Sequence, residues 1–196
     1  MNRNAYPGKP DVSEFRAELL RRKKKKQRLG TFFRSLFYIL VASALVCVLV
    51  VTVQMPVLRI YGSSMTPTLG EGDVVVTYPN KEKPEPGDIV CIRIGTKLLI
   101  KRVIAGPGDT VDIDEKGNVS VNGEILPEPY ATERSAGRCE VELPCRVPED
   151  SYFVLGDCRA VASDSRNAVV GCVESGQIVG EVRLRVWPLR DFGWIG

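Results

Sequence analysis

Two segments of the sequence hold residue types that together can hydrolyse an amide bond. Ser63 and Ser64 lie in IYGSSMTPTLGEGD, where glycines, threonines and a proline predict a turn after a strand. Lys101 and Arg102 interrupt the apolar run LLIKRVI. A serine on a tight turn can attack a carbonyl carbon while nearby backbone N–H groups bind the oxyanion that forms. A lysine that is removed from water loses its proton more readily, and the neutral amine can then accept the serine proton.

The composition restricts the base that such a serine can use. The chain has 196 residues and no histidine, which excludes a Ser-His-Asp triad, a Cys-His pair and imidazole ligands for a metal. The cysteines show no C-x-x-C spacing for zinc or redox chemistry. We therefore expect no metal and no cofactor, and a base other than histidine for any hydrolytic reaction.

Taken one at a time, these segments also have simpler interpretations. The serine segment is compatible with a solvated loop. In a strand, neighbouring side chains point to opposite faces, so Lys101 shares a face with Leu99 and Val103 while Arg102 lies on the other. At least one cation then lies against apolar neighbours, unless the strand is at an edge and both side chains extend their charged ends into water. The sequence leaves these alternatives open.

A third segment, FVLGDCRAVASDSRNAVVG, predicts a strand followed by a loop rich in charged and hydroxyl side chains. A surface loop whose charges pair with one another is the simpler interpretation of the same residues.

The elements that must position these residues are mainly β-strands. Runs such as DVVVTY, DIVCIRI and KLLIKRVIAG alternate with Gly, Pro, Asn and Asp, a pattern typical of an antiparallel β domain. We expect this domain to cover residues 58–196, which is about 140 residues and enough to bury a core. Residues from about 112 to 150 are more polar and richer in turns, which predicts an excursion from the main sheet.

The N-terminal part has a different character. Residues 35–57 carry no charge, and LFYILVASALVCVLVVTV within them is long enough to cross a hydrocarbon layer about 30 Å thick. We interpret this stretch as a permanent transmembrane anchor and not a cleaved export signal, because the apolar run is long and lacks an A-x-A ending.

A block of Lys and Arg residues precedes the predicted anchor, within residues 21–34. Because such cations resist translocation, residues 1–34 are expected to form a basic tail in the cytoplasm, with the β domain on the other side of the membrane. The same cations suit the anionic head groups of a phospholipid bilayer. Their position beside an anchor argues against nucleic acid as the partner.

Cysteine usage adds one hypothesis. Cys47 lies in the predicted anchor, and five further cysteines follow in the β domain. Cys139 and Cys145 bracket a short loop, and on the oxidising side of a membrane they could form a disulfide.

The three segments together, in this order and after an N-terminal anchor, resemble the signature boxes of the type I signal peptidases, which are serine proteases with a Ser/Lys dyad. Residues 64–69 are similar to the family's S-M-x-P-T-L box, residues 87–90 to its G-D-I-V strand, and residues 101–109 to its K-R-V box. Residues 156–166 resemble its last box, G-D-N-R-D-x-S-x-D-S-R. The resemblance spans the anchor and nearly all of the β domain.

The resemblance implies a role for each matching residue. Ser64, directly before the methionine, corresponds to the nucleophile, and Lys101 corresponds to the general base. The oxyanion hole and the first contacts with substrate are expected at Gly62, Ser63, Met65 and Pro67. The residues expected to support the site are Arg102, Asp157, Ser163, Asp164 and Arg166.

Two positions depart from the family pattern. Gly62 replaces a serine whose hydroxyl often contributes to the oxyanion hole, so the hole is expected to use backbone N–H groups such as that of Ser64. In the last box, Ala162 replaces the serine that normally hydrogen-bonds the catalytic lysine. Ser163, one residue along, is the candidate substitute.

The resemblance implies an endopeptidase that removes signal peptides from exported preproteins after small residues at positions −1 and −3. It implies a single-pass plasma-membrane protein, bacterial by default, that binds preproteins in extended form along a strand edge. A membrane-tethered binding or assembly protein with the same fold is the alternative, favoured by the altered last box. SOS-repressor-type autoproteases use a related Ser/Lys pair, but they are cytoplasmic and need no anchor.

Overall fold

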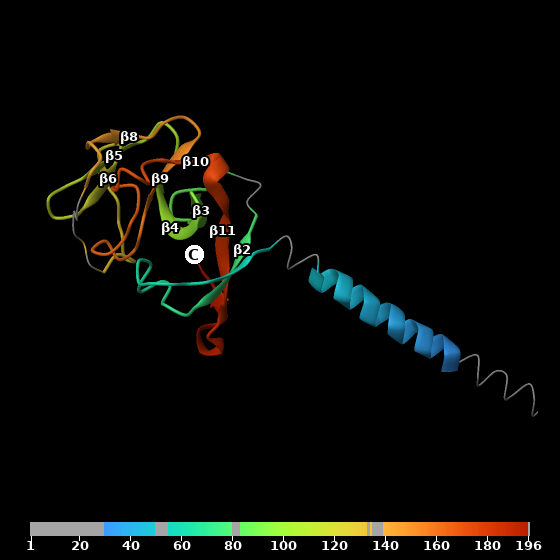
Figure 1. Ribbon diagram of the computed structural model, residues 1–196. Helices are drawn as coiled ribbons and strands as arrows, with labels where there is room; N and C mark the ends of the chain where they lie inside the picture. Colours follow the sequence, from blue (N-terminus) through green and yellow to red (C-terminus); the bar gives the residue numbers. More distant parts are fainter. Residues whose placement is uncertain (1–29, 50–54, 80–82, 133, 135–138, 196) are drawn as a thin grey trace, which may run out of the picture. The chain divides into compact units, whose positions relative to one another are not determined.

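The computed structural model describes residues 30–49, 55–79, 83–132, 134 and 139–195 (Figure 1). The chain divides into two units, Met1–Val51 and Thr52–Gly196. In the first unit, Gly30–Leu49 is a single helix, long and apolar enough to cross a membrane, and none of its most apolar stretch is buried in the protein. It overlaps the predicted anchor; residues 50–54 of that prediction, and residues 1–29 of the predicted tail, lie outside the described residues.

The second unit, called the β unit below, is built on an antiparallel sheet whose strands follow the order β1-β2-β11-β3-β4-β9-β10, with β12 also paired to β11 (Figure 1). These strands are β1 (Val57–Arg59), β2 (Val74–Tyr78), β3 (Ile89–Ile94), β4 (Lys97–Ala105), β9 (Ser151–Leu155), β10 (Val173–Glu174), β11 (Ile178–Trp187) and β12 (Gly193–Trp194). Two short 3-10 helices, η1 (Ser175–Gln177) and η2 (Leu189–Asp191), flank β11. The mainly β, antiparallel fold after an apolar helix confirms the predicted fold class.

A second, smaller sheet follows β4 in the chain. Its order is β7-β6-β5-β8, and its strands are β5 (Thr110–Ile113), β6 (Val119–Val121), β7 (Glu124–Ile125) and β8 (Cys145–Arg146). These strands lie in the stretch where polar residues and turns predict an excursion from the main sheet. Val111 and Val119 turn inward and pack with Phe153 and Leu155 of β9, so the two sheets share an apolar cluster.

The β3–β4 hairpin sets the register of β4, the strand that carries Lys101 and Arg102. Ile94 pairs with Lys97 across a two-residue turn, and Gly95 in that turn has a φ of 60°, a left-handed value that suits glycine. This register places Lys101 opposite Val90 and Arg102 opposite Ile89. From Arg102 onward β4 also pairs with β9, so both cations enter the interior of the sheet.

Candidate active site

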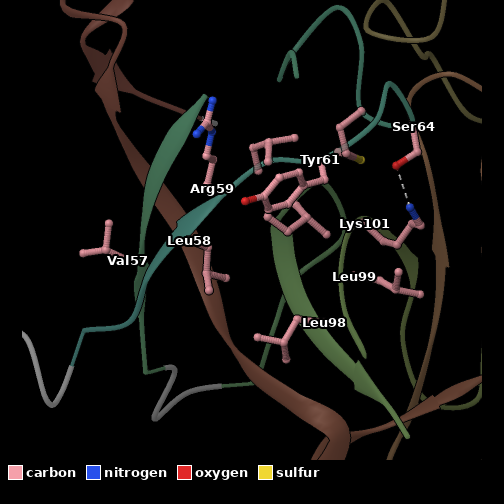
Figure 2. Close-up of a pocket in the computed structure, with 11 residues that line it drawn as sticks. Val57, Leu58, Arg59, Tyr61, Ser64, Leu98, Leu99 and Lys101 are labelled. Atoms are coloured by element: carbon pink, nitrogen blue, oxygen red, sulfur yellow. Dashed lines mark hydrogen bonds between the residues drawn. The ribbon is translucent and has the colours of Figure 1, made fainter. Parts of the chain in front are cut away.

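Ser64 and Lys101 meet in the β unit although 37 positions separate them in the chain. The Nζ atom of Lys101 lies 2.9 Å from the Oγ atom of Ser64 (Figure 2). The serine follows β1 in a turn whose apolar side chains hold it in place: Met65 and Leu69 are buried in one cluster with Ile60. The Leu69 N–H donates to the Met65 carbonyl over 2.8 Å, which closes the turn.

Burial changes the acidity of Lys101. Only 2% of the residue is exposed, and removal from water lowers the pKa of its ammonium from 10.5 to about 8. The carboxylates of Asp164 and Asp157 act in the opposite direction, while the guanidinium of Arg166 lowers the pKa further. The alternative in which Lys101 and Arg102 extend from an edge strand into water is therefore wrong, because both lie in the interior.

Arg102 points to the opposite face of β4 from Lys101, and its hydrogen bonds connect three loops. Its guanidinium forms two hydrogen bonds with the Asp157 carboxylate, of 2.9 and 2.8 Å, and donates to the Gly87 carbonyl over 2.8 Å. Thr68, in the turn that carries Ser64, donates to the same carboxylate over 2.5 Å. The pair is buried, so each charge depends on the other for compensation.

The loop after β9 supports Ser64 through its backbone. The Asp164 carboxylate pairs with Arg166 and also accepts the Gly156 N–H over 3.1 Å. The Cys158 N–H then donates to the Ser64 carbonyl over 3.1 Å. Gly156 permits this approach, because a Cβ there would lie 2.6 Å from the Ser64 carbonyl oxygen.

A pocket of about 380 Å³ opens beside the Ser64–Lys101 pair. Residues of β1 and the Ser64 turn form one wall, and residues 98–101 of β4 form the other (Figure 2). The β4–β9 pairing begins at Arg102, so Leu98, Leu99 and Ile100 are paired only with β3 within the described part of the chain. That section of β4 offers a free edge next to the pocket.

The structure brings together some of the predicted site residues and not others. Met65 lines the pocket, whereas Gly62, Ser63 and Pro67 are exposed and are not among its lining residues. Gly62 has a φ of 83°, which glycine adopts easily. Within the described residues no acceptor takes the Ser64 N–H, so this donor remains available to an oxyanion.

Ser163 does not replace the missing lysine-orienting serine. No hydrogen bond joins its side chain to Lys101 in the described structure; it instead lines a separate pocket of about 230 Å³ with Arg159 and Arg166. The side chain of Asp164, its neighbour, turns inward and is fully buried. The expected one-residue shift fails because Ser163 is exposed, while Asp164 beside it is buried.

The predicted Cys139–Cys145 disulfide is not present. Both cysteines are free thiols, and the Cys139 thiol lies 3.4 Å from the Val141 carbonyl. Cys145 instead has Cys172 as a neighbour, and both pack against the cluster between the two sheets. Burial and the neighbouring Cys145 raise the pKa of the Cys172 thiol to about 12.

Sequence reasoning missed four residues that surround the catalytic segments. Thr68 was part of the matched motif without an assigned role, and no pattern in the sequence pairs Arg159 with Glu128 or Arg102 with Tyr130. Glu128 and Arg159 form a buried ion pair, and the Arg102 guanidinium lies 4.1 Å from the centre of the Tyr130 ring. A buried acidic residue inside a polar, turn-rich segment leaves no periodic signal.

A family model described as "Signal peptidase, peptidase S26" matches residues 32–187. The chain belongs to this family. It is 35% identical over 144 residues to signal peptidase I of Bacillus amyloliquefaciens, an alignment that covers 66% of this chain and 72% of the relative. It is 34% identical over 152 residues to signal peptidase IB of Staphylococcus aureus, covering 68% of this chain and 78% of the relative.

Among solved structures, a signal peptidase I from Enterococcus faecalis matches with a TM-score of 0.41 and 28% identity, over 51% of this chain and 97% of that one. Family membership and the relatives identify this signal peptidase family member as a serine peptidase, and thus a hydrolase. The relatives' names also support signal-peptide removal as its general activity, and its apolar N-terminal helix suits a membrane-anchored enzyme.

Proposed function

We propose that the protein is a membrane-tethered endopeptidase that cleaves signal peptides from preproteins, with Ser64 as nucleophile and Lys101 as general base. The observation that carries this proposal is the 2.9 Å contact between Lys101 Nζ and Ser64 Oγ, made by a lysine that is almost fully buried. Because burial disfavours the ammonium form, a useful fraction of this amine is neutral near neutral pH.

In the proposed reaction, neutral Lys101 accepts the hydroxyl proton as Ser64 Oγ bonds to the scissile carbonyl carbon. The Ser64 N–H is the oxyanion donor that the described structure offers, since it has no other acceptor. The ammonium of Lys101 then protonates the leaving amine, which gives an acyl-enzyme and frees the mature N-terminus. Water, deprotonated by Lys101, hydrolyses the ester and restores Ser64.

The preprotein is proposed to bind as an extended strand in the pocket beside this pair. Leu98–Ile100 provide backbone groups that have only one paired neighbour, the arrangement used when a peptide adds a strand to a sheet edge. Alternate substrate side chains would then point toward the pocket floor, where Met65 and Leu99 lie. The preference for small residues at positions −1 and −3 is proposed from the chain's membership of the signal peptidase family.

The helix Gly30–Leu49 supports tethering to a phospholipid bilayer through an anchor at about residues 35–57. The basic residues that precede this helix favour a cytoplasmic N-terminus, and we propose that the catalytic unit, about residues 58–196, lies outside the cytoplasm. A membrane-embedded signal peptide and an anchored enzyme share one layer, which raises their effective concentration.

Cleavage of a preprotein with an A-x-A leader by the full-length enzyme in detergent tests the dyad. Ser64→Ala and Lys101→Ala should each lower kcat by about 1,000-fold or more, since each removes a reacting group. Lys97→Ala is the matched control for the lysine, because Lys97 is exposed and begins the same strand. Sequencing of the product N-terminus checks the cleavage position.

The same assay separates the enzyme from a non-catalytic binding protein. A binding protein leaves the leader intact at every pH, whereas the dyad gives a rate that falls below about pH 8 as Lys101 becomes protonated. Full activity in either dyad variant, or a rate that stays level from pH 6 to pH 9, is incompatible with the mechanism.

A further inference from the structure

The segment that follows β7 contacts both arginines that brace the catalytic loops. This segment, residues 127–130, is called the strap below. Glu128 and Tyr130 are its inward-facing residues: Glu128 is 2% exposed, and Tyr130 is partly buried and donates a hydrogen bond to it over 3.2 Å. The strap belongs to the small-sheet region, to which sequence reasoning assigned no catalytic role.

Glu128 acts on the loop after β9 through Arg159. Its two carboxylate oxygens accept hydrogen bonds from both terminal nitrogens of the Arg159 guanidinium, and both side chains are almost fully buried. The third guanidinium nitrogen of Arg159 donates to the Gly156 carbonyl over 3.0 Å. A guanidinium with all three nitrogens engaged is fixed in orientation, so Glu128 fixes the position of Gly156.

This connection reaches the proposed nucleophile in two further contacts. Gly156 lies directly under the Ser64 carbonyl, with no room there for a Cβ atom. Cys158, two residues further along, donates its N–H to that same carbonyl. A shift of the loop that Arg159 holds therefore displaces the backbone of Ser64, whose N–H is the proposed oxyanion donor.

Tyr130 acts on the opposite side of the site through Arg102. Its ring lies over the Arg102 guanidinium, 4.1 Å from the ring centre to Cζ. The ring covers the flat face of the cation while Asp157 and Gly87 engage its edge. The same Arg102 guanidinium and Asp157 both bond to Thr68 in the nucleophile turn.

We propose that Glu128 and Tyr130 are positioning residues for the serine peptidase reaction, because together they hold the two arginines that set the backbone on either side of Ser64. This inference rests on the Ser64/Lys101 dyad proposed above. Neither strap residue lines the substrate pocket. Loss of either contact therefore lowers kcat, because the alignment of the reacting groups depends on the strap. KM changes little, because the pocket walls do not depend on the strap.

Glu128→Gln tests the charged contact in the full-length enzyme in detergent. The amide keeps the shape of the side chain but leaves the Arg159 charge without a counter-ion, so kcat should fall about 10–100-fold with KM within about threefold. Glu124→Gln, an exposed glutamate of β7 in the same small sheet, is the matched control and should match the wild type. All rates are normalised to folded enzyme, measured by thermal unfolding of each preparation.

The pH profile is a readout that a purely structural role does not move. Lys101 is faced by Asp157 and Asp164 and by the cation of Arg166. If the Glu128→Gln substitution loosens the strap and lets water reach the Lys101 amine, the pKa of that amine rises toward its usual value. The acid limb of kcat/KM then moves to higher pH. A variant that is only less stable contains less folded protein, but the acid limb of kcat/KM for its folded fraction stays at the wild-type pH.

Tyr130 provides an independent pair of variants that leaves Glu128 and Arg159 in place. Tyr130→Phe keeps the ring over Arg102 and should retain kcat within about threefold, whereas Tyr130→Ala removes the ring and should lower kcat about tenfold or more. If Glu128→Gln does not accumulate as folded protein, this pair alone decides the matter.

Two results overturn the inference. One is wild-type kcat and an unmoved acid limb in folded Glu128→Gln; the other is equal kcat in Tyr130→Phe and Tyr130→Ala. Ser64→Ala, run beside them, separates this failure from failure of the dyad: an active Ser64→Ala variant rejects the dyad itself, while an inactive one beside fully active strap variants rejects only the role of the strap.

Discussion

Replacement of Lys101 by methionine should abolish activity and stabilise the fold at neutral pH. Lys101→Met keeps an unbranched side chain, replaces its Cδ methylene by sulfur and removes the charged amine. The Lys101 residue is 2% exposed, and burial is the largest cause of the lowered pKa of its amine. The native protein therefore holds a charge that the unfolded chain leaves in water, which costs free energy of folding.

The size of this cost follows from the two pKa values. A fall from 10.5 to about 8 is roughly 2.5 pH units, or about 3 kcal/mol at 1.36 kcal/mol per unit. Methionine forfeits the hydrogen bond to Ser64, worth about 1 kcal/mol. The net gain at pH 7 is about 2 kcal/mol, or about 4–8 °C in Tm for a domain of this size.

The sign of the pH dependence distinguishes this effect from ordinary repacking. Below about pH 8 both the native and the unfolded chain carry the proton on Lys101, so the full cost is present. Between about pH 8 and pH 10.5 the unfolded chain binds more protons than the native one, and the wild type gains stability with rising pH. The advantage of Lys101→Met should therefore shrink across that window.

Thermal unfolding of the full-length wild type and Lys101→Met in detergent, from pH 6.5 to pH 10.5, measures this difference. Lys97→Met is the matched control, since Lys97 begins the same strand and is exposed. The difference in stability between Lys97→Met and the wild type should be small and should not change with pH. A Lys101→Met variant that is less stable than the wild type at pH 7, with a difference that does not change with pH, would refute the reasoning.

Two further predictions concern other contacts. Gly156→Ala should destabilise the β unit by about 1–3 kcal/mol and lower kcat, because the added Cβ would lie 2.6 Å from the Ser64 carbonyl oxygen; unfolding and single-turnover cleavage measure the two effects, and an unchanged kcat counts against the close contact. A short bifunctional thiol reagent should link Cys145 to Cys172, which are neighbours over one apolar cluster; peptide mass spectrometry checks the pair, and a link from Cys145 to Cys139 instead would contradict the structure.

Much of the fold could be predicted because its signals are local. Alternating β-branched runs predict the strands, and a long uncharged stretch predicts the apolar helix. The same local logic placed Lys101 and Arg102 on opposite faces of one strand, as β4 has them. That both cations are buried depended on the position of β4 between β3 and β9, which no local pattern encodes.

The contacts of the candidate site were predictable where the residues match the family pattern, as Ser64 and Lys101 do, and not where that pattern is altered or absent. Ser163 was expected to approach Lys101 because it is adjacent to the missing serine, but the inward residue is Asp164. Cys139 and Cys145 were paired by their short separation, yet Cys145 lies beside Cys172 because β8 and the start of β10 meet over one apolar cluster. Proximity in sequence was a poor guide in both cases.

The sequence by itself determined which reacting groups we propose: a chain without histidine, with a serine on a tight turn and a lysine in an apolar run, has few other ways to attack an amide. Only the tertiary structure decided what lowers the pKa of that lysine and what holds the serine in place. The pairs Lys101–Ser64 and Glu128–Arg159 join segments that are 37 and 31 positions apart. Such contacts depend on which strands lie next to each other in the sheet and on the exclusion of water around the side chains. No single segment of the sequence encodes either of these.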